Sequence, residues 1–396
     1  MKPLTRRDFS PLILTAASLG MWMLLHALLG GSFFGPSLYN SYTRQAMAWR
    51  QGLLHLPEDV PYLELAVYGG DYYVSFPPVP SLLLLPLTFL FGMDTPDSLL
   101  MKLYALAACL LINRALKRAG YRRLHAGAFA FLFCFASSLL PLTLDGAVWY
   151  HAQALAFFLI IAALCLMAED HPTPALLCYA LSVGCRPFHA LYALPLFFTW
   201  GSLHQKAGVS LKETARPLLP GIALGLTVAA ALGLYNFFRF GDPLEFGHNY
   251  LPEFSTQGGV QFSLAHIGRN LKTFLWGLPL ERGEDGIRVK AFGYSMLLAC
   301  PALALMIVWF ILDLIKQRFR REKAALLTAC ALHAFLLLLH RTFGGYQLGA
   351  RYAVDLMPYA FFYLLLTPEK NGVRWPEYAL LAAVFLFTVF GMYMMH

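Results

Sequence analysis

The chain has 396 residues, of which 58% are hydrophobic, 15% aromatic and only 13% charged, and its mean hydropathy is +0.57. These values exclude an ordinary soluble domain and predict a polytopic membrane protein. The net charge of +8 does not indicate nucleic-acid binding, because the basic residues fall in short clusters between apolar runs, as membrane topology requires. The seven cysteines lie in apolar segments, which predicts neither a disulfide framework nor a thiolate metal site.

The first predicted membrane helix is Leu12 to Leu29, and Lys2, Arg6 and Arg7 precede it. Basic residues are retained on the cytoplasmic side, so we predict a cytoplasmic N-terminus. No small-residue cleavage site follows Leu29, which favours an uncleaved signal anchor over a signal peptide.

The next apolar run, Val79 to Phe91, has about 13 residues and contains Pro80 and Pro86, so it is too short and too broken to span comfortably. If it crossed, the basic cluster from Arg114 to Arg123 would lie outside, against the positive-inside rule. We therefore predict that Val79 to Phe91 is an interfacial or re-entrant helix on the outer face.

The remaining apolar runs and basic clusters predict about eleven spans, with the N-terminus inside and the C-terminus outside. The further spans are Leu99 to Leu116, Leu124 to Leu142, Ala152 to Met167, a hairpin in Pro174 to Trp200 that turns near Arg186-Pro187, Leu218 to Phe237, Phe292 to Ile315, Ala324 to Leu339, Ala353 to Leu366 and Tyr378 to Met394. The predicted fold is all-α, a single transmembrane domain over residues 1–396. Its outer loops are 32–98 and 239–290, and neither is long enough to form a separate soluble domain.

The first outer loop contains ELAVYGGDYYVSFPPVPSLLLL, in which Glu64 and Asp71 precede an apolar stretch led by two prolines. A carboxylate beside the low-dielectric face of a membrane is suited to act as a general base toward a hydroxyl. Aromatic faces and phenolic hydroxyls suit sugar rings, and the loop supplies Tyr62, Tyr68, Tyr72 and Tyr73. The alternative is a solvated loop with interfacial aromatics.

The outer turn from Asp145 to His151 brings another acid, Trp149 and a histidine to the same face. With Glu64 or Asp71, Asp145 and His151 would complete an oxygen and nitrogen shell for a divalent cation such as Mg²⁺ or Mn²⁺. The alternative, which the sequence slightly favours, is a helix start at which Asp145 satisfies free amides.

Two arginines are candidates for binding an anion. Arg186 lies in a nearly all-apolar hairpin, where a cation is costly unless it meets an anion, such as a phosphate, or reaches the outer headgroups. Arg351 is placed for a lipid-borne phosphate, unless it pairs with Asp355 at the i, i+4 spacing. Further polar candidates for substrate binding on the outer face are Asn236, Arg239, His248 and Gln347.

Taken in order, these passages resemble the GT-C class of polytopic glycosyltransferases that use polyprenyl-phosphate sugars. Within that class the resemblance is to the bacterial branch related to family 39 and the aminoarabinose-transferase-like proteins. The matching passages, which cover Leu12 to Pro358, are YNSYTRQAMAWRQGLLHL, ELAVYGGDYYVSFPPVPSLLLLPLTFLFG, the Trp149 to Gln153 turn, Arg186-Pro187, Tyr235-Asn236 with RFGDPLEFG, and GGYQLGARYAVDLMP.

The resemblance implies that juxtamembrane helices of the first outer loop carry the catalytic carboxylate and that a lipid-linked donor enters from the bilayer. Many relatives have an Asp-Glu pair just after the first span, whereas this chain has no acid in Leu38 to Tyr42. This departure favours Glu64 over Asp71 as the base, because related branches without the pair carry an acid before a similar tyrosine-rich run.

The sequence thus predicts an inverting glycosyltransferase of the bacterial inner membrane, with its site on the extracytoplasmic face. The donor phosphate would meet Arg351 and Arg186 while Glu64 deprotonates a hydroxyl of a glycan, lipid or protein acceptor. Two alternatives stay open. A transporter or flippase of lipid-linked sugars needs polar residues at mid-membrane depth. A catalytically inactive GT-C-like subunit of an envelope assembly is compatible with the missing Asp-Glu pair.

Overall fold

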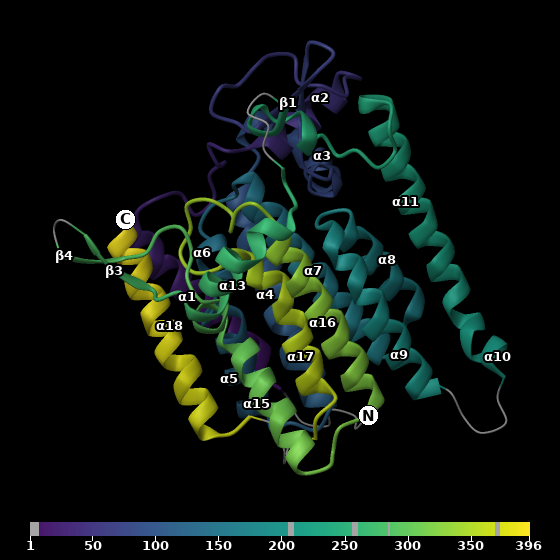
Figure 1. The fold of residues 1–396 in the computed structure, drawn as a ribbon, viewed down its shortest axis with the longest axis vertical. Helices are drawn as coiled ribbons and strands as arrows, with labels where there is room; N and C mark the ends of the chain where they lie inside the picture. Colours follow the sequence, from purple (N-terminus) through teal and green to yellow (C-terminus); the bar gives the residue numbers. More distant parts are fainter. Residues whose placement is uncertain (1–7, 205–209, 256–259, 284–285, 369–372) are drawn as a thin grey trace.

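Apolar segments form the helices of a computed structural model that describes residues 8–204, 210–255, 260–283, 286–368 and 373–396. The helices lie roughly parallel in a bundle, as Figure 1 shows. They are α1 (Ser10–Leu29), α4 (Asp97–Arg118), α5 (Arg123–Phe135), α7 (Val148–Ala168), α8 (Pro172–Val183), α9 (Ala193–His204), α11 (Leu219–Phe240), α15 (Pro301–Ile315), α16 (Arg321–Leu339), α17 (Met357–Leu365) and α18 (Trp375–Met395). Within the described part of the chain, six helical stretches are long and apolar enough to cross a membrane. The predicted all-α polytopic bundle is confirmed.

The centre of the bundle is α7, which packs against α4 and α8. Its sequence is apolar on all sides, and a helix of that kind is buried rather than amphipathic. By contrast, α11 exposes most of its length and leans away from the bundle in Figure 1. A short helix, α10 (Leu211–Ala215), and the 3₁₀ turn η3 (Arg216–Leu218) lead into α11.

Three predicted spans are shorter in the structure. The span that begins at Leu124 ends at Phe135, because the Ser137 hydroxyl binds the Cys134 carbonyl and the Leu139 amide, and α6 (Leu139–Leu142) follows as a separate turn. The spans predicted to start at Phe292 and Ala353 begin at α15 and α17, where a proline occupies the first turn. The short elements before them are α14 (Met296–Ala299) and the 3₁₀ turn η6 (Arg351–Leu356).

The predicted hairpin of Pro174 to Trp200 is present. Helix α8 ends before Arg186, whose backbone is extended, and η2 (Pro187–Tyr192) turns the chain into α9. A residue before proline disfavours the helical conformation, which explains the position of the turn.

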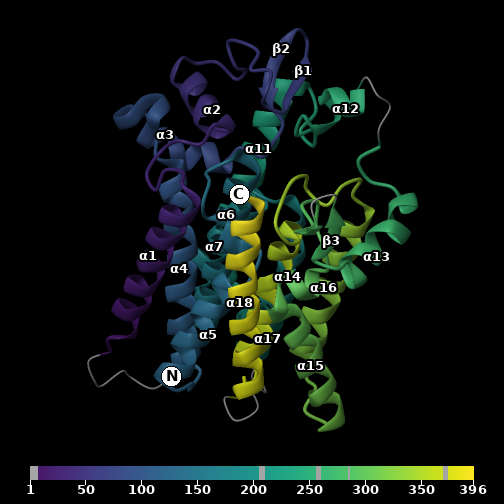
Figure 2. The same ribbon diagram turned by 90° about the vertical axis from the view of Figure 1, so that its left-hand side faces the viewer.

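The first outer loop forms a cap over one end of the bundle, visible in Figures 1 and 2. Its elements are α2 (Ser41–Arg50), β1 (Leu65–Tyr68), β2 (Asp71–Val74), α3 (Val79–Phe91) and η1 (Gly92–Asp94). Helix α3 has the predicted bounds and lies beside α2 above the bundle, where the Ser81 hydroxyl donates to the Gln45 side chain at 2.7 Å. The antiparallel β1–β2 hairpin, which turns at Gly69 and Gly70 with positive φ, was not predicted.

The second outer loop is built from short elements on the same face. They are η4 (His248–Tyr250), α12 (Pro252–Ser255), η5 (Leu264–His266), α13 (Ile267–Trp276), β3 (Leu280–Gly283) and β4 (Gly286–Val289). The C-terminal end of α18 lies on this face too, because the Tyr346 hydroxyl contacts the Met395 carbonyl at 3.3 Å. At the opposite face, Arg114 pairs with Glu169 at 2.5 Å.

Candidate functional site

Glu64 is tied to the start of α7 by a hydrogen bond. Its Oε2 atom accepts from the indole Nε1 of Trp149 at 2.9 Å, and the Trp149 ring lies 5.0 Å from the ring of Tyr39. The Glu64 side chain is otherwise exposed. The structure therefore brings together the predicted base and the predicted outer turn, and leaves the second carboxylate oxygen open to a solute.

Asp71 lies at the far end of the β1–β2 hairpin. It pairs with Tyr68 in the strand register, so it is on the order of 13 Å along the strand from Glu64. Its Oδ2 atom is 3.8 Å from Nδ1 of His55. The two acids of the first loop therefore do not converge on one reacting group.

Two tyrosines of the hairpin, Tyr73 and Tyr68, pack on the end of α11 and on η4. The Tyr73 ring lies 5.1 Å from Phe240, and the Tyr68 ring lies 4.6 Å from Tyr250. Burial and the neighbouring Asp71 raise the pKa of Tyr73. Tyr72 pairs with Val67 in the sheet. The rings of Tyr68 and Tyr73 thus belong to an aromatic cluster with Phe240 and Tyr250, whereas Tyr72, on the other face of the hairpin, packs against the first-loop core that Trp149 also contacts.

Of the loop tyrosines, Tyr62 lies nearest to Glu64 in the chain. Its hydroxyl accepts from Arg44 Nη2 at 3.2 Å, and its ring lies 6.3 Å from Tyr39. Tyr39 also contacts Trp149, so the aromatic side chains around Glu64 come from the first loop and from α7.

The predicted cation shell does not assemble. Asp145 Oδ1 accepts from the amide of Ala147, the N-cap residue of α7, at 3.0 Å, within the turn that precedes the helix. His151 is buried, with its Nε2 atom 3.4 Å from the Tyr104 hydroxyl, and so turns into the core. Among the described residues, no group of three His, Cys, Asp or Glu side chains is arranged to hold a metal ion. The described side chains that were predicted to form the shell therefore do not fit a divalent cation.

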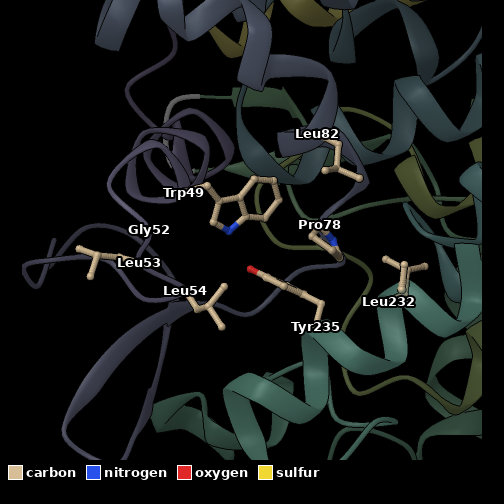
Figure 3. Close-up of a pocket in the computed structure, with 9 residues that line it drawn as sticks. Trp49, Gly52, Leu53, Leu54, Pro78, Leu82, Leu232 and Tyr235 are labelled. Atoms are coloured by element: carbon tan, nitrogen blue, oxygen red, sulfur yellow. The ribbon is translucent and has the colours of Figure 1, made fainter.

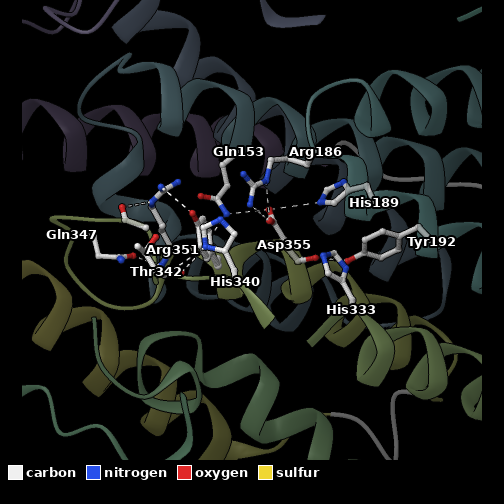
Figure 4. Close-up of polar contacts among 12 residues, drawn as sticks. Gln153, Arg186, His189, Tyr192, His333, His340, Thr342, Gln347, Arg351 and Asp355 are labelled. Carbon is white, nitrogen blue, oxygen red and sulfur yellow. Dashed lines mark hydrogen bonds and ion pairs between the residues drawn. The ribbon is translucent and has the colours of Figure 1, made fainter. Parts of the chain in front are cut away.

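Arg186 has a carboxylate partner. Its Nε and Nη2 atoms donate to Asp355 Oδ2 at 3.0 and 2.7 Å (Figure 4). Asp355 is buried, and its Oδ1 atom accepts from Gln153 Nε2 at 3.0 Å. The alternative in which Asp355 pairs with Arg351 is therefore wrong. The reason is that η6 turns Asp355 toward the α8–α9 hairpin, a contact that helical spacing does not reveal.

Arg351 is held by neutral groups. Its Nε atom donates to the Gly344 carbonyl at 2.9 Å, and its backbone amide donates to Gln347 Oε1 at 2.7 Å. In the part of the chain that the structure describes, no ion pair involving Arg351 is found. Its guanidinium is thus a cation without a carboxylate, which suits it to an incoming anion.

One tyrosine ring contacts both arginines. The guanidinium carbons of Arg186 and Arg351 lie 5.2 and 4.6 Å from the centroid of Tyr352. The ring of His340 lies 5.5 Å from the same tyrosine. Burial, together with nearby positive charges that include both arginines, lowers the pKa of His340 to about 4. His340 is therefore neutral at physiological pH. Sequence reasoning missed Tyr352, although it lies in the passage GGYQLGARYAVDLMP, and it missed His340, which lies just before that passage.

The three polar candidates near α11 hold the cap in place. Arg239 is buried and donates to the Val74 carbonyl at 2.9 Å and to Asn236 Oδ1 at 2.8 Å. His248 Nδ1 lies 3.1 Å from the Ser75 carbonyl. These contacts join α11 and η4 to the end of β2. They position the first loop.

An apolar pocket of about 340 Å³ lies between the first-loop cap and α11 (Figure 3). Its lining residues are Trp49, Gly52, Leu53, Leu54, Pro78, Leu82, Ala231, Leu232 and Tyr235. A second apolar pocket of about 270 Å³ lies between α8, α9 and α11 and also contacts Leu232. In Figure 3, the Trp49 nitrogen and the Tyr235 hydroxyl face the first pocket. The two pockets share Leu232, whose side chain also lies beside Gly184, two positions from Arg186.

Comparisons with known proteins identify the fold. The oligosaccharyltransferase of Archaeoglobus fulgidus in its apo form matches 97% of this chain and 55% of its own, with a TM-score of 0.53 and 14% identity. ArnT from Cupriavidus metallidurans bound to undecaprenyl phosphate matches 89% of this chain and 58% of its own, with a TM-score of 0.50 and 13% identity. AglB from Archaeoglobus fulgidus, in complex with an inhibitory peptide and a dolichol-phosphate, matches 97% and 55%, with a TM-score of 0.51 and 12% identity.

The chain therefore has a GT-C type fold and spans a little more than half the length of these structures. No protein-family model matches the sequence, and the comparison with curated proteins found no match.

Proposed function

We propose that the protein is a membrane glycosyltransferase that moves a sugar from a polyprenyl-phosphate donor to an acceptor hydroxyl on the extracytoplasmic face. The observation that carries this proposal is that an exposed carboxylate, Glu64, and an arginine without a carboxylate partner, Arg351, lie at the same end of a GT-C type bundle. Two structures with this fold were solved with undecaprenyl phosphate and with a dolichol-phosphate, which supports a lipid phosphate as the donor group.

Adjacent residues of α7 link the two ends of the proposed site. Trp149 binds Glu64, and the hydroxyl of Tyr150 contacts the Tyr346 carbonyl at 3.4 Å. Tyr346 belongs to the glycine-rich loop whose Gly344 carbonyl contacts Arg351. The start of α7 is thus the common support of the proposed base and the proposed phosphate site.

In the proposed reaction, Arg351 binds the donor phosphate, and its charge stabilises the polyprenyl phosphate as it leaves. The free oxygen of Glu64 takes the proton of the acceptor hydroxyl. The acceptor oxygen then attacks the anomeric carbon as the bond from that carbon to the phosphate breaks. Attack opposite the leaving group inverts the anomeric configuration. Arg186 forms an ion pair with Asp355 and positions the Tyr352 ring. The exposed part of its side chain also contacts the phosphate in this reaction.

The two apolar pockets along α11 suit the isoprenoid chain of the donor. A hydrocarbon chain gains about 0.8 kcal/mol for each methylene removed from water, so an apolar channel favours a long lipid over a soluble sugar nucleotide. Leu232 borders both pockets and would contact the chain where one pocket passes into the other.

Purified protein in liposomes, supplied with a radiolabelled polyprenyl-phosphate sugar and a panel of glycan, lipid and peptide acceptors, tests the proposal. A covalent glycoside that forms only with the protein is the expected result. Movement of the labelled lipid between leaflets without a new glycoside would indicate a transporter. The absence of both, in protein that binds the donor, would indicate a non-catalytic subunit.

A further inference from the structure

The β3–β4 hairpin projects sideways from the bundle, level with the outer end of α18, as Figure 1 shows. Directly paired residues of an antiparallel hairpin share a face, and the faces alternate along each strand. Leu280 pairs with Val289, and Arg282 pairs with Ile287, so these four residues lie on one face. The opposite face carries the pair of Glu281 and Arg288, whose side chains form an ion pair at 2.9 Å.

Contacts with α18 fix the direction of the apolar face. Val289 is buried in the main hydrophobic core, and β4 packs against α18. Ile287, on the same face, is 71% exposed and lies beyond that contact. The nearby outer half of α18 is itself an apolar exposed surface that includes Phe390 and Tyr393. Since α18 is a membrane-spanning helix, this face of the hairpin continues a lipid-facing surface.

The segment before the hairpin extends this surface. Trp276 at the end of α13 is 75% exposed, and Leu278 is 69% exposed. Contiguous apolar side chains that a soluble protein would bury mark an interaction surface. Tryptophan is enriched where a membrane meets water, because its ring is apolar while its N–H can bind headgroups.

We propose that the β3–β4 hairpin, with Trp276 and Leu278, lies in the headgroup region of the outer phospholipid leaflet. Ile287 and Leu280 contact the upper acyl chains, and Arg282, on the same face, reaches the lipid phosphates. The ion pair of the opposite face remains in water. A phospholipid surface is favoured over a protein partner because the apolar face is continuous with α18 and lies at the depth where that helix ends.

This membrane contact would set the depth, relative to the lipid headgroups, of the glycine-rich loop that precedes Arg351. The segment that follows β4 is bonded to that loop, because the Gln347 amide donates to the Ala291 carbonyl at 3.4 Å and the Tyr294 amide donates to the Gly349 carbonyl at 3.2 Å. Gln347 in turn accepts from the Arg351 amide. The placement of Arg351 beside a donor phosphate rests on the proposed function, whereas the membrane contact of the hairpin does not.

The test uses the full-length protein in phosphatidylcholine nanodiscs, with a fluorescent NBD group attached to Ile287→Cys or to its opposite-face control, Arg288→Cys. Among the native cysteines only Cys178 is not fully buried, so labelled wild-type protein gives the background. We expect the probe at position 287 to emit at a shorter wavelength than the probe at 288 and to lose intensity when the lipid carries a shallow nitroxide. The probe at 288 should respond instead to aqueous iodide.

Equal quenching of both probes by iodide would overturn the proposal, because it would place the apolar face in water. Protection of position 287 from both quenchers would also overturn it and would indicate a protein partner or a second copy of the chain. Both outcomes leave the proposed glycosyl transfer untouched, because the measurement requires no sugar donor.

Discussion

The guanidinium of Arg186 donates two hydrogen bonds to one oxygen of Asp355, at 3.0 and 2.7 Å. This pair joins the α8–α9 hairpin to η6 and uses the acid that would otherwise lie one helical turn from Arg351. Arg351 is left with neutral partners and shares the Tyr352 ring with Arg186. The division of roles between the two arginines follows from this contact.

Asp355→Asn should destabilise the protein, because it leaves the charge of Arg186 unpaired in a largely buried site. Removal of one partner of a buried ion pair costs about 3–5 kcal/mol, and the lower end applies here because 22% of the Arg186 side chain is exposed. Thermal unfolding in detergent measures the loss, with the exposed Glu58→Gln as a control. Adding Arg186→Met to Asp355→Asn should restore part of the stability. Equal stability of Asp355→Asn and wild type would contradict the structural role of the pair.

Arg351→Met should weaken use of the lipid donor, because it removes the cation that binds the phosphate. Loss of a charged hydrogen-bonding group corresponds to a decrease of about 10- to 100-fold in kcat/KM. Steady-state kinetics with varied donor concentration measures this change. Arg341→Met, which changes a partly exposed arginine in the same loop, is the matched control. A similar decrease in both variants would show that the effect is not specific to Arg351.

Trp149→Phe should lower kcat by about 10-fold and leave the KM for the donor nearly unchanged, because it removes one hydrogen bond to a charged group. The phenyl ring keeps the contact with Tyr39, while the donor to Glu64 is lost. Kinetics with both substrates varied separates the two parameters. A change confined to the KM for the donor would mean that Trp149 supports lipid binding instead of positioning Glu64.

Acid should destabilise the protein in part through His340. Burial, with the neighbouring positive charges, lowers its pKa in the folded state to about 4, below the ordinary value of 6.5. The unfolded state therefore binds the proton first, so stability decreases as the pH falls from about 6.5 to about 4. His340→Gln should lose less stability over this range than wild type, as measured by unfolding temperature at a series of pH values. The exposed His171→Gln should behave as wild type, and identical pH curves for all three proteins would exclude His340 as a contributor.

Leu232→Trp should impair long-chain donors more than short-chain ones. The larger ring would fill the point where the two apolar pockets meet, and overfilling an apolar site prevents an extended chain from entering. The KM values for long and short polyprenyl-phosphate sugars measure the difference. Leu234→Trp, on an exposed part of α11, is the control. An equal change for both chain lengths would place the isoprenoid chain elsewhere.

Local signals in the sequence were sufficient for much of the architecture. Apolar length and basic clusters predicted the spans, and prolines with the positive-inside rule placed α3 outside the bundle with the bounds that the structure has. The two β-hairpins were missed, because two-stranded ribbons of four-residue strands have no strong sequence period. The first hairpin contacts α11 and the second contacts α18, and both helices are distant from these hairpins in the chain.

The candidate site was predicted only in part. Glu64, Trp149, Arg186 and Arg351 were chosen from residue type and position, and the structure places them at one end of the bundle. Their partners were not foreseen, because Asp355 binds Arg186 across 169 positions and Trp149 binds Glu64 across 85. Spacing along one helix reveals only neighbours a turn away, so Arg351 was the only partner it offered for Asp355. Asp145 and His151 were grouped with Glu64 or Asp71 because all were predicted on one face of the membrane, and a shared face does not determine which side chains meet.

The most direct test compares single-turnover sugar transfer by Glu64→Gln and Asp71→Asn, at saturating donor and acceptor. We expect that Glu64→Gln, which keeps an oxygen to accept from Trp149, folds and binds donor but loses transfer by about 100-fold or more, as for removal of a general base. Asp71→Asn should retain nearly full transfer. Near-normal transfer by Glu64→Gln, or a comparable loss in Asp71→Asn alone, would contradict the assignment of Glu64 as the base.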